Sequence, residues 1–367
     1  MIKLIERRKL SHINICLEEN VQARNVSTGF EDVFLVHRAL PEISIKEVDT
    51  STEFFDHRFS APILIESMTG GVREAAKINA TLAEAAEIIG LPLGIGSQRA
   101  AIENSSLAYT YKVARDKAPN TFLIANLGGA QLTRGYGLTE AQKAVDMIDA
   151  DALALHLNPL QEAVQPEGER NYGKALPRIK KITEALSVPI IIKETGAGIA
   201  AEEAKMIEDV GVKGIDVSGT GGTSWAAVEC YRAKELKDRL REKLGESFWD
   251  WGIPTAVSVV ETHLSTKLKV IASGGVRTGI DAAKAIALGA DVAGLALPLL
   301  KPALEGTEKV IETLQTLIEE LKIAMFLTGS KTIDDLKNSS VVIIGKTAEW
   351  LRARGFDIES YARRRRI

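Results

Sequence analysis

The sequence predicts an α/β fold: a (β/α)8 TIM barrel formed by one domain over residues 1–367, with an N-terminal extension and an insertion after strand six. Short apolar runs alternate with stretches of helical periodicity, and the first four runs end near residues 65, 95, 125 and 155. This regular spacing fits one strand, one helix and two loops in each unit. A doubly wound sheet also alternates strands with helices, but it seldom gives eight evenly spaced units.

The eight apolar runs predict strands that are buried on both faces, as parallel strands are when helices cover a sheet. The expected strands are PILI (62–65), PLGI (92–95), TFLIA (121–125), ALAL (152–155), PIII (189–192), GIDV (214–217), KVIA (269–272) and VAGLAL (292–297). Helices are expected between the strands. The clearest are residues 79–90, which stop at Gly90, and residues 279–290, which end at Gly289. A third covers residues 139–149, with Thr139 as its N-cap.

Two segments lie outside this alternation. Residues 1–60 form the extension, with a basic helical start followed by VFLVHR (33–38) and ISIKEV (43–48), which we expect to pair and close the bottom of the barrel. The insertion lies between Val217 and Ala272, and its residues 226–244 predict one charged helix. The basic run Arg363–Arg366 predicts a solvated tail or a contact with a neighbouring subunit.

Composition and charge exclude several classes of protein. The chain carries 46 basic and 49 acidic residues, so it lacks the positive field of a nucleic-acid binder. No run of 18 apolar residues predicts a membrane span, and the start resembles no signal peptide. Cys16 and Cys230 are the only cysteines, too few for a disulfide framework or a thiolate metal site. We therefore expect a cytoplasmic protein without nucleic-acid or membrane partners.

The loops after strands six and seven predict a phosphate site, because glycines let backbone N–H groups approach an anion. Gly274, Gly275 and Arg277 would form the cradle, and Thr223 would add a hydroxyl from the preceding loop, which also holds Ser218. The alternative is that these glycines only form tight turns.

A second anion site is suggested by basic residues elsewhere. Arg99 follows the second strand, and Arg8, Lys9 and His12 lie in the extension, where Arg8 and His12 would share one helix face. Surface charges are the alternative for Arg8 and Lys9. Two phosphate sites on one barrel would indicate a phosphorylated cofactor together with a phosphorylated substrate.

Single polar residues at strand ends carry further hypotheses. Lys193 could form a Schiff base, balance an anionic cofactor, or pair with Glu194 or Asp216. Glu162 is a candidate Mg²⁺ ligand or else a solvated carboxylate.

Three more residues have a functional and a structural interpretation. His156 could titrate or donate to an anion, or be a core histidine. Trp225 and Glu229 lie four residues apart and would share a helix face, where they could cover a ring and offer a proton donor. Core packing and a solvated carboxylate are the alternatives for this pair.

These residues belong to motifs that stand in one order along the chain. The motifs are RKLSH (8–12), SMTGG (67–71), GIGSQR (94–99), ANLGGAQ (125–131), HLNPLQEAVQPEGE (156–169), SGTGGTSW (218–225), ASGGVRTG (272–279) and ALP (296–298). Together they closely resemble type II isopentenyl-diphosphate isomerase over nearly the whole chain. The resemblance implies a TIM barrel that uses reduced FMN, Mg²⁺ and NADPH to interconvert isopentenyl and dimethylallyl diphosphate, and an assembly such as a tetramer or octamer.

The resemblance also assigns roles residue by residue. Implied FMN contacts are Ser67, Met68, Thr69, Ser97, Asn126, Lys193, Ser218, Thr223, Gly275, Val276, Arg277, Ala296 and Leu297. Implied substrate contacts are Arg8, Lys9, His12, Ser97, Gln98, Arg99, His156, Asn158 and Gln161. Glu162 matches the Mg²⁺ ligand, and the implied catalytic residues are Gln161, His156, Glu229 and Lys193.

The chain departs from the family at Glu66, where a Thr is common. An acid there would oppose an anionic flavin unless it faces away, so Glu66 is excluded from the predicted site. On the favoured hypothesis the reduced flavin N5 carries the proton and the apolar barrel mouth keeps water from the cationic intermediate. The alternatives are an FMN-dependent oxidoreductase of the 2-hydroxyacid or dihydroorotate type, and a flavin-binding scaffold without catalytic activity.

Overall fold

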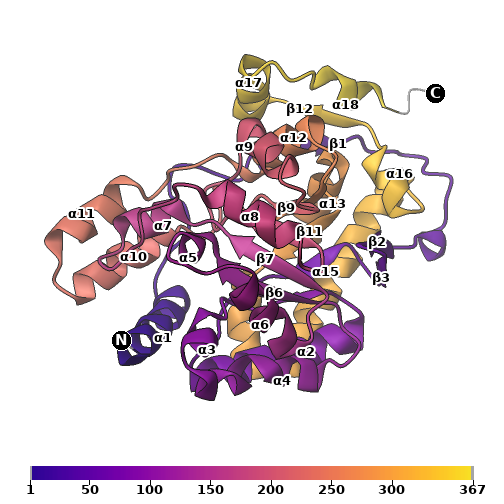
Figure 1. Cartoon of the computed structure of the whole chain (residues 1–367). Helices are drawn as coiled ribbons and strands as arrows, with labels where there is room; N and C mark the ends of the chain where they lie inside the picture. The colour runs from indigo at the N-terminus through magenta and orange to yellow at the C-terminus, as the bar shows by residue number, and fades with distance from the viewer. Residues whose placement is uncertain (1, 365–367) are drawn as a thin grey trace.

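Eight parallel strands close into a barrel, as predicted, in the computed structural model of the chain. The structure describes residues 2–364, with side chains from Arg7 onward. The barrel strands are β4 (Ile63–Ile65), β5 (Leu93–Gly94), β6 (Leu123–Gly128), β7 (Ala152–His156), β8 (Ile190–Lys193), β9 (Gly214–Asp216), β10 (Lys269–Ala272) and β11 (Val292–Leu295). Parallel pairing of β11 with β4 completes the ring, which lies at the centre of the molecule (Figure 1).

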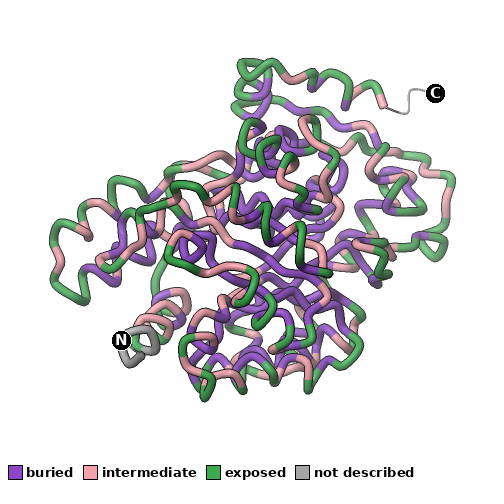
Figure 2. Tube along the Cα trace, viewed as in Figure 1, coloured by how far each residue is buried: buried purple, intermediate pink, exposed green. Residues whose placement is uncertain are grey.

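Helices surround the strands and carry the outer layer of the core. They are α2 (Arg73–Ile89), α3 (Arg99–Glu103), α4 (Tyr109–Lys117), α5 (Gly129–Leu132), α6 (Leu138–Ile148), α7 (Pro159–Val164), α8 (Ala175–Thr183), α9 (Ala201–Glu208), α12 (Thr255–Ser265), α13 (Gly279–Leu288), α14 (Leu297–Glu305) and α15 (Thr307–Leu327). Burial is concentrated in the strands and the helix faces that cover them (Figure 2). Strands buried on both faces explain why their sequences are apolar throughout.

Two of the expected helix starts are wrong. α2 begins at Arg73, earlier than expected, and the N-cap of α6 is Gly137, so Thr139 lies inside the first turn. Glu140 accepts a hydrogen bond from the Gly137 N–H, which fixes that start. α13 ends at Gly289 as predicted, with a left-handed φ of 117° at its C-cap.

The bottom of the barrel is closed by a different segment from the one expected. β1 (Val33–Leu35) pairs antiparallel with β12 (Val341–Ile343) near the C-terminus, not with residues 43–48. Those residues form a 3-10 turn (Ile45–Glu47), because a capping box between Ser44 and Glu47 satisfies its first N–H groups.

The element that fills the barrel bottom is the hairpin of β2 (Thr52–Phe54) and β3 (His57–Phe59). Phe54 and Phe59 are buried in the inner core cluster together with Phe122 at the start of β6. The rings of Phe59 and Phe122 meet edge to face, with centroids 5.7 Å apart. These aromatic side chains close the barrel at the end opposite to the loops that follow the strands.

The part of the insertion predicted as one charged helix, residues 226–244, belongs to two helices. α10 (Trp225–Glu235) and α11 (Arg239–Ser247) extend to one side of the barrel beside α1 (Ile2–Glu18) (Figure 1). The chain turns at Lys237, which has a left-handed φ of 59°, and Asp238 then caps α11 by accepting from the Arg241 N–H. The predicted charged helix is therefore broken by a local capping signal.

The C-terminal part adds α16 (Ile333–Lys337), α17 (Gly345–Ala353) and α18 (Glu359–Arg363). Arg364 is not simply solvated, because it donates to the carbonyls of Ala287 and Lys337 and its guanidinium lies 4.0 Å from the centre of the Tyr361 ring. Arg365 and Arg366 of the basic run lie outside the described residues.

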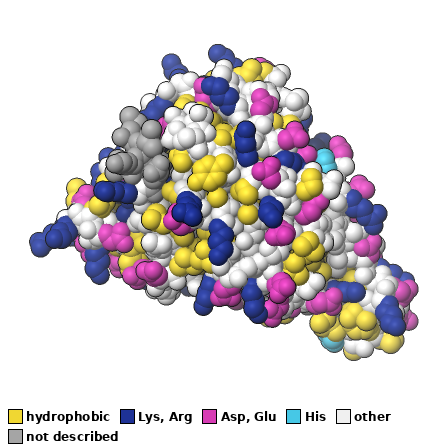
Figure 3. Space-filling view, turned by 90° about the horizontal axis from the view of Figure 1, so that it is seen from below, with side chains coloured by type: hydrophobic (Ala, Val, Ile, Leu, Met, Phe, Trp, Pro, Cys, Tyr) yellow, Lys and Arg dark blue, Asp and Glu magenta, His cyan; other side chains and the backbone are white. Residues whose placement is uncertain are grey.

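Two further features of the described chain bear on its class. No described helix is long and apolar enough to cross a bilayer. Charges of both signs are interspersed over the face seen in Figure 3.

Candidate active site

One cavity lies at the carboxyl ends of the barrel strands and gathers most of the predicted site residues. Predicted residues that line it are Arg8, Lys9, His12, Ser67, Met68, Thr69, Ser97, Arg99, Asn126, His156, Asn158, Gln161, Glu162, Lys193, Ser218, Thr223, Gly275, Arg277, Ala296 and Leu297. Trp225 and Glu66 also line it. α1 contacts α10 and α14, and its residues Arg8, Lys9 and His12 form part of the cavity wall.

The two glycine-rich loops after β9 and β10 pack against each other at one end of this cavity. A Cβ on Gly222 would lie 2.3 Å from the nitrogen of Gly275, so the approach requires glycine. Among the described residues, the N–H groups of Gly275 and Val276 have no protein acceptor, and Nη2 of Arg277 is buried without a partner. Buried donors without acceptors suit a phosphate group.

Lys193, at the end of β8, lies between two carboxylates: Asp216 of the adjacent strand β9 and Glu66, which follows β4 across the barrel. Its Nζ is 2.9 Å from Oε2 of Glu66 and also bonds to Asp216. Glu194 does not pair with it, because that carboxylate accepts the N–H groups of the next three residues. Burial would lower the pKa of Lys193, but the charges of Asp216 and Glu66 raise it, so the side chain remains an ammonium. An ammonium suits charge balance and not a Schiff base.

Glu66, which was excluded from the predicted site, is in the cavity wall. It lies at the end of β4, and its Oε1 is buried with no hydrogen-bond partner among the described residues. The acidic residue was visible in the sequence as a strand-end side chain, but its contact with Lys193 depends on the closed barrel.

His156, at the end of β7, is held by Asn126 of the adjacent strand β6. Nδ1 of His156 lies 2.7 Å from Oδ1 of Asn126. Burial, then the charges of Lys193 and Lys9, lower the pKa of His156 to about 4. The ring is therefore neutral at ordinary pH, and with this amide orientation Nδ1 carries the proton.

A cationic group lies where α1 meets the loop after β5. Nζ of Lys9 donates to the Ser97 carbonyl at 3.0 Å and to the Tyr111 hydroxyl at 3.1 Å. Both acceptors are uncharged. Burial, then Arg8 and Arg99, lower the pKa of Lys9 to about 7. Tyr111 was not predicted, since nothing in its local sequence shows that it meets Lys9.

The two arginines of this group differ in their partners. Arg99 is paired with Glu103 at 2.7 Å, whereas Arg8 has no partner among the described side chains. The charges of Glu167, Glu229 and Glu162 also act on Arg8, but without an ion pair. Three basic side chains of which only Arg99 is ion-paired suit a strongly negative ligand.

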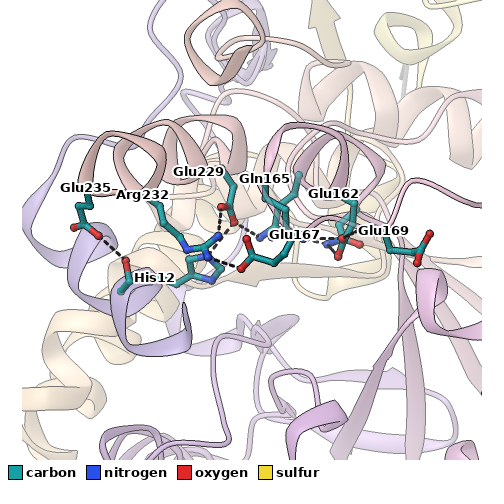
Figure 4. A network of polar contacts seen from close by, with 11 residues as sticks. His12, Glu162, Gln165, Glu167, Glu169, Glu229, Arg232 and Glu235 are labelled. Carbon is teal, nitrogen blue, oxygen red and sulfur yellow. Dashed lines mark hydrogen bonds and ion pairs between the residues drawn. The ribbon is translucent and has the colours of Figure 1, made fainter. Parts of the chain in front are cut away.

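A network of polar contacts joins α1, α7 and α10 beside the cavity (Figure 4). Oε1 of Glu229 lies 2.9 Å from Nε2 of His12 and accepts from Gln161 at 3.0 Å, while Oε2 accepts from Arg232 at 3.0 Å. Arg232 also pairs with Glu167. Burial would raise the pKa of Glu229, but His12 and Arg232 outweigh it and lower the pKa to about 2.

The predicted catalytic residue Glu229 lies outside the cavity lining, and its pKa is lowered. It reaches the site through His12 and Gln161, which both contact its carboxylate. Trp225 reaches the same place from the start of α10, with its ring centroid 5.2 Å from that of His12. Arg232 was missed, although its spacing of three residues from Glu229 on a helix was a usable signal.

Glu162 is not a solvated carboxylate. It is buried at the cavity wall, where Oε2 accepts from Gln165 at 2.6 Å and from the Glu169 N–H, and Oε1 lies 3.3 Å from the Asn158 amide. In the described part of the chain, no three His, Cys, Asp or Glu residues are grouped to hold a metal. One carboxylate fits Mg²⁺ only when phosphate and water complete its shell.

Besides Glu229, two predicted site residues do not line the cavity, Gln98 and Val276. Gln98 is fully buried, donates to the Ala144 carbonyl and accepts from the Asn126 N–H. The Val276 side chain is in the hydrophobic core. In each motif the flanking residues line the cavity: Ser97 and Arg99 beside Gln98, and Gly275 and Arg277 beside Val276.

The donor set fits FMN. The free N–H groups of the glycine loop and Arg277 suit its phosphate, and Lys193 suits the negative edge of a reduced ring. Met68 and Leu297 add apolar surface along the same wall, while Ser67 and Thr69 add hydroxyl groups.

Comparison with known proteins supports this interpretation. The family model described as FMN-dependent dehydrogenase matches residues 2–133 and 141–343. A protein of Methanosarcina acetivorans named isopentenyl-diphosphate delta-isomerase is 51% identical over 362 residues, covering 99% of this chain and 98% of its own. A protein of the same name from Methanothermobacter thermautotrophicus is 50% identical over 361 residues, covering 98% of this chain and 100% of its own.

Solved structures agree on the fold. The lactate oxidase of Pediococcus acidilactici superposes with a TM-score of 0.67 at 18% identity over 94% of each chain. A variant of flavocytochrome b2 gives a TM-score of 0.67 at 20% identity, covering 97% of this chain and 88% of its own. The matches over nearly the full length, at about half identity, show that the chain belongs to the isopentenyl-diphosphate delta-isomerase family within the FMN-dependent dehydrogenases.

Proposed function

We propose that this protein interconverts isopentenyl and dimethylallyl diphosphate by a 1,3-proton shift, with reduced FMN as its cofactor. The observation that carries the proposal is one cavity with two separate groups of anion-binding residues, one at Gly275 and Arg277 and the other at Arg8, Lys9 and Arg99. A phosphorylated cofactor and a diphosphate substrate account for both groups.

The chain's own residues bind and orient in this proposal. Gly275 and Arg277, with Ser218 and Thr223, hold the FMN phosphate, and Lys193 offsets negative charge on the ring. When bound, reduced FMN supplies the acid–base group that moves a proton onto and off the alkene.

The diphosphate is bound at the other end by Arg8, Lys9 and Arg99. Glu162, a buried carboxylate in the cavity wall, would hold Mg²⁺, with diphosphate and water completing the coordination of the ion. His156 is neutral and donates or accepts a hydrogen bond without adding charge.

The hydrocarbon part of the substrate lies between these ends. Trp225, Met68 and Leu297 supply apolar surface that excludes water from the cationic reaction centre. His12 and Gln161 are positioned beside it by the Glu229 carboxylate. Preorganised dipoles in a water-poor site are a large source of catalysis.

The test is conversion of isopentenyl diphosphate by the reduced, Mg²⁺-supplied holoenzyme, followed by NMR without an added electron acceptor. We expect dimethylallyl diphosphate to form with no net oxidation. Consumption of one acceptor per turnover would instead indicate an oxidoreductase of the 2-hydroxyacid or dihydroorotate type. Bound flavin without any conversion would indicate a scaffold without catalytic activity.

Three finer parts of the proposal have their own tests. Removal of Mg²⁺ by a chelator should abolish turnover, and Glu162→Gln should raise the Mg²⁺ concentration required. NADPH should bleach the oxidised flavin absorbance under anaerobic conditions, which would make it a reductant.

We also propose a homo-oligomer, a tetramer or octamer, in the cytoplasm. Phe34 and Val342 stand opposite each other on the β1–β12 ribbon, and they are 49% and 38% exposed. Light scattering measures the assembly. The two free cysteines, Cys16 and Cys230, are consistent with a reducing compartment.

A further inference from the structure

The Glu66 carboxylate is the least satisfied acidic group in the cavity. Oε1 is buried without a partner among the described residues, and Oε2 has only Lys193 at 2.9 Å and the Ser67 N–H at 3.1 Å. The backbone of β11 closes over it, because a Cβ on Gly294 would lie 2.4 Å from Oε1. Neither the space nor the donors allow Glu66 to be solvated as an exposed carboxylate would be.

Asp216 competes with Glu66 for the same ammonium and is better bound. Besides Lys193, it accepts from the Ser273 hydroxyl at 2.5 Å and from the Ser218 N–H at 3.2 Å. Hydrogen bonds to a carboxylate favour its charged form. If Glu66 and Asp216 cannot both stay ionised beside Lys193, Glu66 is therefore the one that takes up a proton.

The groups around Glu66 leave no other source of positive charge. Among the described residues, Lys193 from β8 is the only cation bonded to it, and Asp216 from β9 is negative. His156 on β7 is neutral, and the Glu194 carboxylate is turned to backbone N–H groups. β5 and β11, the strands beside β4, contain no titratable residue. When both acids are ionised, which for Glu66 means above about pH 8, one ammonium thus faces two carboxylates.

An anionic ring beside Lys193 would add a third negative charge. Repulsion between like charges disfavours ionisation, so one acid must then become neutral. We propose that Glu66 is a positioning residue that takes up a proton when negative charge arrives on the cofactor and so leaves Lys193 to offset that charge. This inference rests on the proposed binding of FMN next to Lys193, and it deepens that proposal.

The proton balance of the step is definite. An external donor such as dithionite supplies two electrons, one proton goes to the flavin to give its anionic reduced form, and a second proton from solvent converts the Glu66 carboxylate to the acid. Burial, then the charge of Asp216, already raise the pKa of Glu66 to about 8. The negative ring raises it further. Below about pH 8, Glu66 is already protonated before the flavin is reduced. Above about pH 8, Glu66 is a carboxylate in the oxidised protein, and reduction of the flavin makes it take up a proton.

The experiment is a reductive titration of the holoenzyme followed by flavin absorbance from pH 6 to pH 10. The pH dependence of the two-electron midpoint potential gives the number of protons taken up. We expect the wild type to take up one proton below about pH 7 and two above about pH 8. Glu66→Gln should take up one proton over the whole range, because its amide does not titrate.

Two more variants make the test specific. Glu319→Gln removes an exposed carboxylate on α15 and should behave as the wild type. Glu194→Gln removes the other buried acid near Lys193, whose pKa is raised to about 7 by burial. Loss of the second proton in Glu194→Gln but not in Glu66→Gln would overturn the inference.

Further outcomes are equally decisive. Identical proton counts in the wild type and Glu66→Gln, with flavin bound in both, would overturn the inference and leave the proposed function intact. Absence of flavin from the wild type would overturn the proposed function itself. If Glu66→Gln does not fold, infrared difference spectra of the wild type serve instead: a carboxylic acid band should appear on reduction at pH 9, and its absence would refute the inference.

Discussion

Lys9 offers the sharpest test of the diphosphate site, because its ammonium has no counterion. Its two hydrogen-bond acceptors, the Ser97 carbonyl and the Tyr111 hydroxyl, are uncharged. A bound anion would supply the missing charge. Lys9→Met keeps an unbranched side chain only one atom shorter and removes the charge and its donors, while Lys112→Met makes the same change on the exposed face of α4.

The expected loss follows from the strength of one charged hydrogen bond. Such bonds contribute about 1.5–3 kcal/mol, which corresponds to roughly a tenfold to a hundredfold change in dissociation constant. The full effect requires a protonated lysine. Burial, then Arg8 and Arg99, lower the pKa of Lys9 to about 7, so the free protein carries this charge below pH 7 and loses it above.

Calorimetric titration with inorganic pyrophosphate and Mg²⁺ from pH 6 to pH 9 measures this effect. At pH 6, Lys9→Met should bind about tenfold to a hundredfold more weakly than the wild type. At pH 9 the wild type must first take up a proton, so the ratio should fall toward one. Lys112→Met should match the wild type throughout. Equal affinities at pH 6, or a ratio that does not change with pH, would refute the assignment of Lys9.

Two further predictions concern the framework of the site. Gly96→Ala should reduce the FMN occupancy measured by absorbance, because the new Cβ would lie 2.4 Å from the Thr69 carbonyl oxygen. The control is Gly137→Ala, whose Cβ would meet no atom within 4 Å. Phe122→Ala should lower the free energy of unfolding in urea by about 3–5 kcal/mol, because it opens a cavity at the barrel bottom. Phe34→Ala, at a side chain 49% exposed, should cost far less, and equal losses would contradict this account of the core.

The sequence predicted the barrel well because burial on both faces leaves a local signature. Each strand is a short apolar run, and the strand-end position alone identified Lys193 and His156. Pairings between distant segments leave no such signature. β1 pairs with a strand about 300 residues later, and nothing in either segment specifies the other.

Side-chain direction was the second limit of the sequence. The motif that contains Gln98 predicted a substrate contact, yet that amide satisfies backbone groups of neighbouring elements. Glu66 shows the reverse error, because its charge argued against the site while the barrel turns it toward Lys193. Both errors concern the surroundings of one side chain, which depend on atoms brought together only by the fold.

The N-terminal extension links the two ends of the cavity. α1 carries Arg8 and Lys9 at the proposed diphosphate end. The segment that follows α1 bonds to the glycine-rich loop at the other end: the Ala23 N–H donates to the Gly222 carbonyl, and the Ser224 N–H donates to the Val21 carbonyl.

The same stretch of chain thus fixes the phosphate cradle and presents the substrate cations. A displacement of α1 would disturb both, so binding of one phosphorylated ligand should order the site for the other. This connection gives the extension a role that the barrel strands do not perform, since Arg8 and Lys9 come from α1 and not from a strand end.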